Sequence, residues 1–410
     1  MNSWKKIFTI IWTGQIFSIL TSNTIGYAVT FWLSIETGKP GVLAMSYIAA
    51  LLPQAILGIF SGVIVDRFNK KAIMILADVF IATCTLVLAL IFFLGIAELW
   101  HIYILLALRS AGSAFHGPAW QAAIPLLAPH DKLTRIAAVN QTIISLSTIA
   151  GPVLGALLIS VMDMSYILLI DVCGALIACT ALLFIKIPKV KTEIEAIRLN
   201  VFRDIKDGVN EILKHTGLIW IIIFSMLSNF FIMPIGALFP LVSLQHFMGN
   251  EFHMSVVEMA WGGGMLIGGA IIGIINNRFN KVDIINYMYF TTGISFFISG
   301  LLPQSGFVWF VILAVLSGIS WALYLPSVTV VLQTIVKPEV LGRVFALTMN
   351  VSMLPSMLGL LGTGFIAEKI GMLNIFVIGG LGIVLIGVIS EMLPSIKVLR
   401  KNVETTNKTD

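Results

Sequence analysis

Four side chains that can carry charge and lie inside long apolar stretches of the sequence are candidates for chemistry. They are Asp78, Arg109, His116 and Asp171. A charge in an apolar environment is costly, so such residues are candidates for a functional site, with a structural ion pair as the alternative. A carboxylate beside an arginine can be bare or protonated, because the apolar setting and the cation act on it in opposite directions. The chemistry that these residue types offer is proton uptake and release.

The stretches around these residues are long enough to cross a membrane. Of the 410 residues, 58% are hydrophobic and only 11% are charged, and the mean hydropathy is +1.00. A soluble protein could not bury so much apolar surface, and roughly 20 apolar residues span a bilayer as a helix. The sequence predicts an all-α integral membrane protein with twelve such helices, at residues 7–33, 42–65, 72–96, 100–122, 134–161, 165–185, 218–245, 254–276, 283–302, 307–335, 344–366 and 373–393.

Basic residues set the expected orientation of these helices. With the N-terminus inside, 22 of the 25 Lys and Arg residues fall on the inner side, Lys39 and Lys369 fall outside, and Arg109 lies in a span. The positive-inside rule favours this arrangement, with both termini cytoplasmic. The net charge of +5 is then a consequence of membrane orientation. Nucleic-acid binding is not expected, because no soluble segment has a basic patch with interleaved aromatic residues.

Depth along the predicted helices suggests partners for the four membrane residues. At about 1.5 Å per residue, Arg109 begins about 12 Å and Asp171 about 9 Å from the outer ends of their helices. We expect these two to pair, and Asp78 and His116, which lie at similar depth from the inner side, to form a second pair. Each aspartate is either a proton carrier or part of a fixed ion pair, and His116 is either a proton relay or a structural histidine.

The two halves of the chain resemble each other. GVIVDRFNKK, residues 62–71, is matched by GIINNRFNK, residues 273–281, at six positions with an offset of 211, and Pro118 corresponds to Pro326 with an offset of 208. Two six-helix halves of the same orientation are typical of a transporter that rocks between two states. The sequence predicts domains at 1–185 and 218–410, with a linker at 186–217.

The linker is predicted to contain an amphipathic helix. Apolar residues recur at three- and four-residue steps, at Ile194, Ile197, Val201, Ile205, Val209, Ile212 and Leu213. This spacing favours a helix lying on the inner membrane surface, with a regulatory role as the alternative.

Several functional classes have no support in the sequence. No phosphate-binding loop, metalloprotease helix or nucleophile elbow is found, so no enzyme is predicted and no cofactor is expected. The three cysteines have no metal-like spacing, and no metal site is predicted. A channel would more often be built by oligomers around a pore, and a receptor without transport would not need charges inside the membrane.

The repeated loop has features beyond simple anchoring by positive charge. Gly58 and Gly62 form a small face on the second helix that allows close helix approach. Asp66 can pair with a loop cation, Arg67, Lys70 or Lys71, and with the positive end of a helix. Such a contact would form when the inner side is closed, so Gly62, Asp66, Arg67, Lys70 and Lys71 are predicted to act in gating. In the second copy Asn277 replaces the carboxylate.

The loop resembles motif A of the major facilitator superfamily, Gly-x-x-x-Asp-Arg-x-Gly-Arg-Arg, with Asn69 in place of its second glycine. In that family the loop latches the outward-facing state. Ser147-x-x-x-Gly151-Pro152-x-x-Gly155 resembles motif C of drug exporters, which implies export and a gating role for Gly151, Pro152 and Gly155. Its glycine face is expected to meet the glycine-rich helix at 254–276. Leu105-x-x-x-Arg109 is similar to the proton-coupling motif B, although Gly112 comes one residue early.

Within this superfamily the whole chain resembles the bacterial macrolide-efflux (Mef-type) permeases. The similarity rests on WTGQIFS from Trp12, VDRFNKKAIMILAD from Val65, LRSAGSAFHGPA from Leu108, IDVCGALIA from Ile170, MPIGALFPLVSLQHF from Met233 and LGRVFAL from Leu341. The resemblance implies a bacterial plasma-membrane exporter that exchanges a bulky lipophilic drug, such as a macrolide, for protons by alternating access. A lysophospholipid transporter or flippase and a siderophore or metabolite exporter are the alternatives. Some Mef-type proteins cooperate with a separate ATP-binding protein.

The superfamily fold also suggests where a substrate would bind. Its fourth helix lines the central cavity, which would place the face that contains Ser113 and Trp120 near the substrate. Such a cavity is expected to be mainly apolar and aromatic, with few polar groups. Candidates for substrate contact are Gln15, Asn23, Trp120, Asn229, Trp321 and Tyr324.

Overall fold

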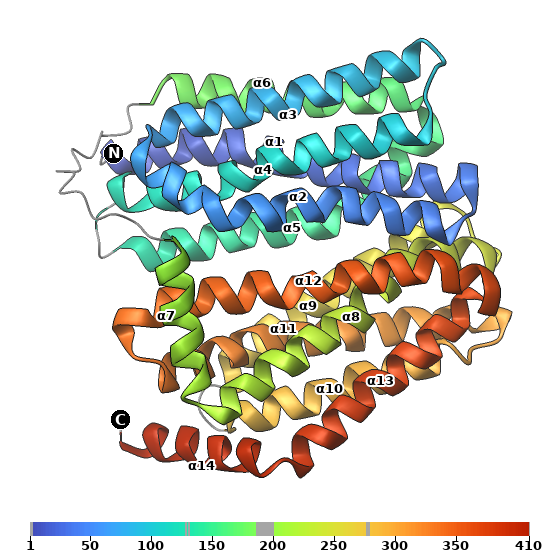
Figure 1. Ribbon diagram of the computed structural model, residues 1–410. Coiled ribbons are helices and arrows are strands. Elements are labelled where there is room, and N and C mark those ends of the chain that lie inside the picture. The colour runs from blue at the N-terminus through green and yellow to red at the C-terminus, as the bar shows by residue number, and fades with distance from the viewer. Residues whose placement is uncertain (1–2, 128, 130–131, 186–200, 276–278, 410) are drawn as a thin grey trace. The chain divides into compact units, whose positions relative to one another are not determined.

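The computed structural model describes residues 3–127, 129, 132–185, 201–275 and 279–409. Within these residues the chain is almost entirely helical and contains no β-strand (Figure 1). The α-helices are α1 (Ser3–Thr37), α2 (Pro40–Arg67), α3 (Lys70–Phe93), α4 (Leu99–Leu127), α5 (Leu133–Val161), α6 (Met164–Leu183), α7 (Val201–Leu213), α8 (Thr216–Gln245), α9 (Glu251–Ile275), α10 (Lys281–Ser299), α11 (Phe307–Ile335), α12 (Pro338–Ile370), α13 (Met372–Met392) and α14 (Pro394–Thr409).

The twelve predicted membrane runs coincide with α1–α6 and α8–α13. Ten stretches of the described helices are long and apolar enough to cross a membrane. Of the twelve helices that match the predicted runs, the two outside this group are α4, which contains Arg109 and two histidines, and α10, which has 19 residues and begins with Lys281 and Asp283. These polar residues lower the hydropathy of the two helices. The prediction of an all-α membrane protein is confirmed.

The first compact unit comprises Met1–Gly38 and Met45–Ile197. In it α1 packs against α5 and α6, while α3 packs against α4 and α6. The indole Nε1 of Trp12 donates a hydrogen bond of 2.8 Å to Asn140 Oδ1, which ties α1 to α5. A Cβ atom at Gly14 would lie 2.8 Å from Ala181 Cβ, so α1 and α6 approach each other more closely than a larger residue would permit.

The second unit comprises Lys39–Ala44 and Arg198–Asp410 and repeats this packing. Here α8 packs against α12 and α13, and α10 packs against α11 and α13. Helices α9 and α11 also pack closely, because a Cβ atom at Gly268 would lie 2.6 Å from the carbonyl oxygen of Ile319. The matching neighbours in the two units provide structural support for the sequence repeat.

The repeated phrase also has a local structural cause. Asn69 caps the N-terminus of α3, because its side chain accepts hydrogen bonds from the backbone N–H groups of Lys71 and Ala72. Asn280 caps α10 in the same way by accepting from Val282 N. Asparagine is among the best N-cap residues, since its side-chain oxygen satisfies an N–H group that has no partner within the helix. The helix start therefore explains why asparagine stands where motif A has glycine.

Two further helices belong to the second unit. The linker helix α7 packs against α12 (Figure 1), and Arg343 Nη1 lies 3.3 Å from Asp207 Oδ2. Its apolar residues Val209 and Leu213 remain exposed, while Glu211 is buried. Residues 194 and 197 of the predicted stripe lie outside the described residues.

Glu211 of α7 has a lowered pKa. The main cause is the hydrogen bond of 2.6 Å that Lys214 Nζ donates to its carboxylate, and burial acts in the opposite direction. The hydrogen bond therefore favours the ionised form of this carboxylate.

The C-terminal tail forms α14, a helix that the sequence analysis did not predict. Arg400 of α14 lies 2.5 Å from Asp283 Oδ1 at the start of α10 and 2.8 Å from Glu391 Oε1 at the end of α13. These contacts fasten α14 to the ends of two predicted membrane helices.

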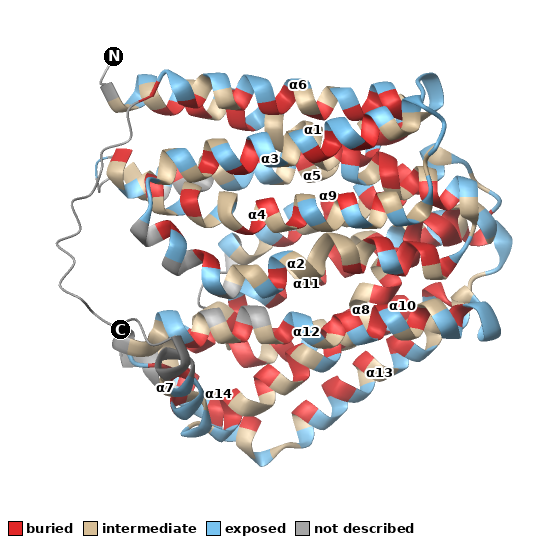
Figure 2. Cartoon of the chain, turned by 45° about the horizontal axis from the view of Figure 1, so that its top comes forward, coloured by how far each residue is buried: buried red, intermediate tan, exposed pale blue. Residues whose placement is uncertain are grey.

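Side-chain burial follows the helical repeat along the membrane helices. Buried and exposed residues alternate along them (Figure 2). Many exposed side chains are large and apolar, such as Leu76 on α3, Leu176 on α6 and Leu358 on α12. Exposed apolar surface on this scale is expected where the surrounding solvent is lipid.

Candidate functional site

The first predicted pair is a tightly bonded network around Asp171. Arg109 Nη1 on α4 lies 2.5 Å from Asp171 Oδ2 on α6. Thr85 Oγ1 on α3 is 2.9 Å from the same oxygen, and Ser22 Oγ on α1 donates to Oδ1 at 2.7 Å. Arg109 also donates to Thr85 Oγ1. Both carboxylate oxygens therefore have hydrogen-bond donors, supplied by three different helices.

The second predicted pair, Asp78 and His116, has fewer hydrogen-bond partners than the first. His116 Nε2 on α4 lies 3.3 Å from Asp78 Oδ1 on α3, and the aspartate is 5% exposed. Neither His116 Nε2 nor Asp78 Oδ2 has a hydrogen-bond partner among the described residues. Buried polar atoms in folded proteins are usually hydrogen-bonded, so two unsatisfied atoms in adjacent titratable side chains stand out.

Asp171 of the first pair and both members of the second pair border a single cavity inside the first unit, named here the acid–base cavity. Its volume is about 270 Å³. Its walls come from α1, α3, α4 and α6, and its lining residues are Gln15, Ser18, Ile19, Ser22, Asn23, Asp78, Ile81, Ser113, His116, Gly117, Asp171 and Ala175. A polar cavity of this size has room for several water molecules. The predicted contact residues Gln15 and Asn23 lie in its wall.

The geometry separates the possible roles of the two aspartates. Asp171 accepts hydrogen bonds at both oxygens, and one of the donors is the guanidinium of Arg109. Asp78 has an oxygen with no donor among the described residues and faces the cavity beside an imidazole. A proton can therefore be added to Asp78 or His116 without breaking a hydrogen bond between described residues.

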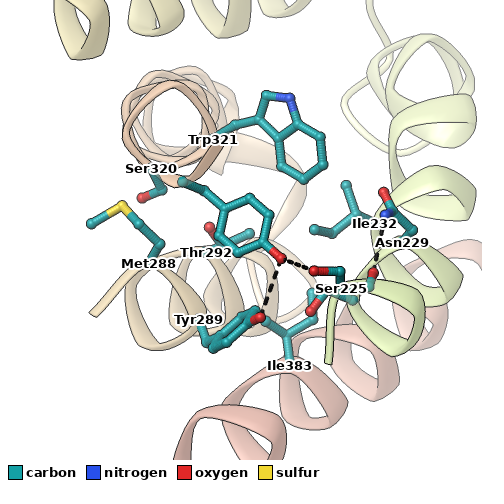
Figure 3. A pocket seen from close by; sticks show the side chains of 11 residues that line it. Ser225, Asn229, Ile232, Met288, Tyr289, Thr292, Ser320, Trp321 and Ile383 are labelled. Atoms are coloured by element: carbon teal, nitrogen blue, oxygen red, sulfur yellow. Dashed lines mark hydrogen bonds between the residues drawn. The ribbon is translucent and has the colours of Figure 1, made fainter. Parts of the chain in front are cut away.

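Three predicted contact residues meet in a pocket of the second unit, named here the tyrosine pocket. It is lined by Ser225, Ser228, Asn229, Ile232, Met288, Tyr289, Thr292, Ser320, Trp321, Tyr324 and Ile383 (Figure 3). Tyr324 OH lies 2.5 Å from Ser225 Oγ and 3.3 Å from Tyr289 OH. The Trp321 ring stacks on the Tyr324 ring with 5.8 Å between centroids. None of the described residues that line this pocket is charged.

Trp120 lies apart from both pockets. Its ring centroid is 6.3 Å from that of Phe8 on α1, and it packs against a buried cluster that contains Ile11 and Ala123. Helix α4 therefore presents Ser113 and His116 to the acid–base cavity, while Trp120 packs further along the helix in the apolar core. The predicted contact between Trp120 and a substrate has no support from this packing.

The gating residues of the loop are only partly described. The side chains of Asp66 and Arg67 lie outside the described part of the structure, as do the surroundings of Gly62. Lys71 Nζ donates to the carbonyl oxygens of Leu183 and Ile185 at 3.0 and 2.7 Å, so it binds the C-terminal end of α6. A cation at the negative end of a helix dipole is stabilising. The predicted gating role of the loop stays a prediction.

The expected partner of the motif C glycines is wrong. A Cβ atom at Gly151 would lie 3.3 Å from Asn23 Cβ, and one at Gly155 would lie 3.1 Å from the carbonyl oxygen of Thr24. Both glycines therefore face α1 of their own unit, and Pro152 between them is buried. In the glycine-rich helix α9, Gly268 faces α11 instead. The glycine face of α5 therefore serves a contact inside the first unit, whereas on α9 a Cβ atom at Gly263, Gly269 or Gly273 would meet no atom within 4 Å.

Sequence reasoning missed Glu258 and the polar neighbours of the pairs. Glu258 lies within α9, is 6% exposed and has no hydrogen bond or ion pair with another described residue. Its position inside an apolar run could have revealed it. Thr85, Ser22 and Ser225 gave no such signal, because serine and threonine are common in membrane helices, where they bond to backbone carbonyls.

Comparison with known proteins connects this fold to transporters. The family model described as "Transmembrane secretion effector", one of the major facilitator families, matches residues 3–409. Macrolide efflux protein A of Streptococcus pyogenes is 38% identical over 398 residues, covering 97% of this chain and 98% of the relative. The protein of the same name from Enterococcus faecalis is 40% identical over 323 residues, covering 79% of this chain and all of the relative.

Solved structures agree on the fold. The nucleoside transporter NupG has a TM-score of 0.71 at 13% identity, covering 95% of this chain and 98% of that chain. A bacterial homologue of the iron transporter ferroportin, in an inward-facing state, has a TM-score of 0.74 at 13% identity, covering 94% and 99%. The chain has the major facilitator fold and belongs to the transmembrane secretion effector family of that superfamily.

Proposed function

We propose that this protein exports lipophilic drugs, macrolides first among them, in exchange for protons by alternating access. The support for macrolides is the similarity to two macrolide efflux proteins over most of the chain. The support for export is the family description and the presence of motif C. The distribution of basic residues supports a plasma-membrane location with both termini in the cytoplasm.

Proton coupling is supported by the Asp78–His116 pair in the acid–base cavity, where Asp78 Oδ2 and His116 Nε2 have no hydrogen-bond partner among the described residues. A proton arriving through the cavity can bind Asp78 Oδ2, which accepts no hydrogen bond from a described residue. Protonation removes the negative charge of the carboxylate and with it the attraction for the imidazole 3.3 Å away. Loss of this attraction between α3 and α4 is a local change that can favour one of two helix arrangements.

Arg109 and Asp171 have a different role in this proposal. Their hydrogen-bond network joins α1, α3, α4 and α6 around the same cavity. Breaking a buried ion pair leaves an uncompensated charge, which is strongly destabilising. The pair therefore holds the walls of the cavity in place, while Asp78 takes up and releases the proton.

Accumulation of a labelled 14-membered macrolide tests the function. Cells that make the protein should accumulate less drug than control cells, and a protonophore should raise accumulation to the control level. Asp78→Asn should remove export, whereas Asp163→Asn, which changes an exposed aspartate before α6 whose side chain makes no capping hydrogen bond, should not. Export that persists in the presence of protonophore would contradict proton antiport.

Purified protein in liposomes separates proton exchange from an ATP-driven partner. A pH gradient alone should drive macrolide transport in vesicles that contain only this chain. Transport that requires a separate ATP-binding protein would overturn the antiport mechanism. If the cells export lysophospholipid or a siderophore but no macrolide, the substrate assignment is wrong, and Asp78→Asn then shows whether that transport uses the same proton site.

A further inference from the structure

The acid–base cavity and the tyrosine pocket occupy equivalent positions in the sequence repeat. With the offset of 211 that relates the repeated loops, Asp78 corresponds to Tyr289. The offset of 208 that relates Pro118 to Pro326 carries His116 onto Tyr324. Asp78 and His116 line the acid–base cavity, and Tyr289 and Tyr324 line the tyrosine pocket. The distance is 3.3 Å in both pairs, between Asp78 Oδ1 and His116 Nε2 and between the two tyrosine hydroxyl groups.

Other lining residues also correspond, one dipeptide at a different offset of 206 and one residue at the offset of 208. Ser22-Asn23 of α1 is matched by Ser228-Asn229 of α8, and both dipeptides line their pockets. Ser113 is carried onto Trp321 by the offset of 208. The tyrosine pocket is therefore the counterpart of the acid–base cavity, built by α8, α10, α11 and α13 in place of α1, α3, α4 and α6.

The two pockets differ in charge and in free space. Aromatic side chains replace Asp78, Ser113 and His116 at the equivalent positions and fill the tyrosine pocket. Its free volume is about 10 Å³, close to the minimum for one water molecule, against about 270 Å³ in the acid–base cavity. Where the acid–base cavity has the titratable pair Asp78 and His116, the tyrosine pocket has the two hydroxyl groups of Tyr289 and Tyr324.

The hydrogen bonds of the tyrosine pocket can be exchanged at low cost. The hydroxyl group of Tyr324 lies 2.5 Å from Ser225 Oγ and 3.3 Å from the hydroxyl group of Tyr289. Ser225 Oγ also lies 2.8 Å from the carbonyl oxygen of Ile221, so it keeps an acceptor when Tyr324 turns away. Trp321, which is only partly buried, stacks on Tyr324 and can move with it.

We propose that the tyrosine pocket is an uncharged ligand subsite that takes an oxygen-bearing part of the lipophilic substrate. Tyr324 OH leaves Ser225 and donates to a ligand hydroxyl, ether or carbonyl oxygen, while the rings of Trp321 and Tyr324 pack against the apolar face of the ligand. Few polar groups among aromatic walls are typical of ligand pockets. This inference rests on the proposed function in one respect, the lipophilic class of the substrate.

Binding of erythromycin to the purified protein tests the subsite. The readout is quenching of tryptophan fluorescence at one fixed pH, with Trp321→Phe identifying the part of the signal that comes from Trp321. Tyr324→Phe should raise the Kd about 3- to 10-fold, the loss expected for one neutral hydrogen bond. Tyr287→Phe is the matched control, because Tyr287 is exposed on α10 outside the pocket, and its Kd should match that of the unmodified protein.

Ser225→Ala gives the opposite expectation. It removes the resting partner of Tyr324 but leaves the donor to the ligand, so the Kd should stay unchanged or fall up to about 3-fold. A purely structural role for the hydrogen bond predicts weaker binding in both variants. Equal weakening by Ser225→Ala and Tyr324→Phe, or no weakening by Tyr324→Phe, would overturn the subsite. Melting curves of each variant confirm that only folded protein is compared.

The same experiment distinguishes failure of this inference from failure of the proposed function. Binding that depends on Tyr324 without export would support the subsite and refute macrolide export. Export with a Kd that does not respond to Tyr324→Phe would refute the subsite alone. If erythromycin neither quenches the fluorescence nor is exported, both proposals are wrong.

Discussion

Replacing Asp171 by asparagine tests the division of roles between the two membrane aspartates. The side chains of Arg109 and Asp171 are 13% and 3% exposed, so Asp171→Asn leaves a largely buried guanidinium without its counter-ion. Removing one partner of a buried ion pair costs about 3–5 kcal/mol. At about 2–4 °C per kcal/mol for a unit of this size, the melting temperature should fall by about 10 °C.

The matched change at the other pair should have little effect on stability. Asp78→Asn alters a carboxylate whose Oδ2 accepts no hydrogen bond from a described residue. Its melting temperature should therefore stay within about 3 °C of the unmodified protein, which corresponds to about 1 kcal/mol. Its proton-driven export should nevertheless be lost, whereas Asp171→Asn should retain pH-dependent export by the fraction of protein that remains folded.

The melting temperature is measured on detergent-solubilised protein, with size-exclusion chromatography used to detect loss of the folded form. Export is measured in liposomes as transport per folded molecule. The double variant Arg109→Met with Asp171→Leu removes both charges and should recover much of the lost stability. If Asp171→Asn melts like the unmodified protein but has no pH-dependent export, Asp171 is the proton carrier and the assignment made from hydrogen bonding is refuted.

Four smaller changes test the local structure. Asn69→Ala and Asn280→Ala should each cost about 1 kcal/mol through loss of an N-cap, measured as lower melting temperatures; unchanged melting would show that the caps are dispensable. Gly155→Leu should reduce folded yield in size-exclusion profiles, because its Cβ would already lie 3.1 Å from the backbone of α1, and normal yield would contradict this close contact. The lowered pKa of Glu211 means that its bond to Lys214 stabilises the fold above the ordinary pKa of 4.5 and is lost as pH falls below it. Glu211→Gln should therefore flatten the acid side of the stability profile, and an unchanged profile would exclude this contribution.

The fold was predictable because the membrane imposes a simple rule on the sequence. Each helix needs a long apolar run, and basic residues gather at particular ends of the runs. Helix α14 was missed because its sixteen residues contain little apolar sequence and depend on Arg400 contacts with Asp283 and Glu391. Such contacts join residues far apart in the chain, and no local pattern reveals them.

The candidate site was predictable in part, for a related reason. Depth along a helix was enough to expect Arg109 with Asp171 and Asp78 with His116, since rise per residue is nearly constant. Rotation about the helix axis and neighbouring polar groups are not given by depth. The sequence therefore could not show that Asp171 receives three hydrogen bonds while Asp78 Oδ2 receives none from a described residue.

The difference between the two repeated pockets has a physical rationale. An ionisable pair inside a membrane protein needs space for water or hydrogen-bond donors, which the acid–base cavity and its network provide. Placing the same pair in both halves would incur this cost twice. Tyr289 and Tyr324 keep a hydrogen-bonded contact between the equivalent helices without charge, and their rings fill the space that a titratable site must leave open. One repeated framework can thus provide a proton site in one half and an aromatic, uncharged site in the other.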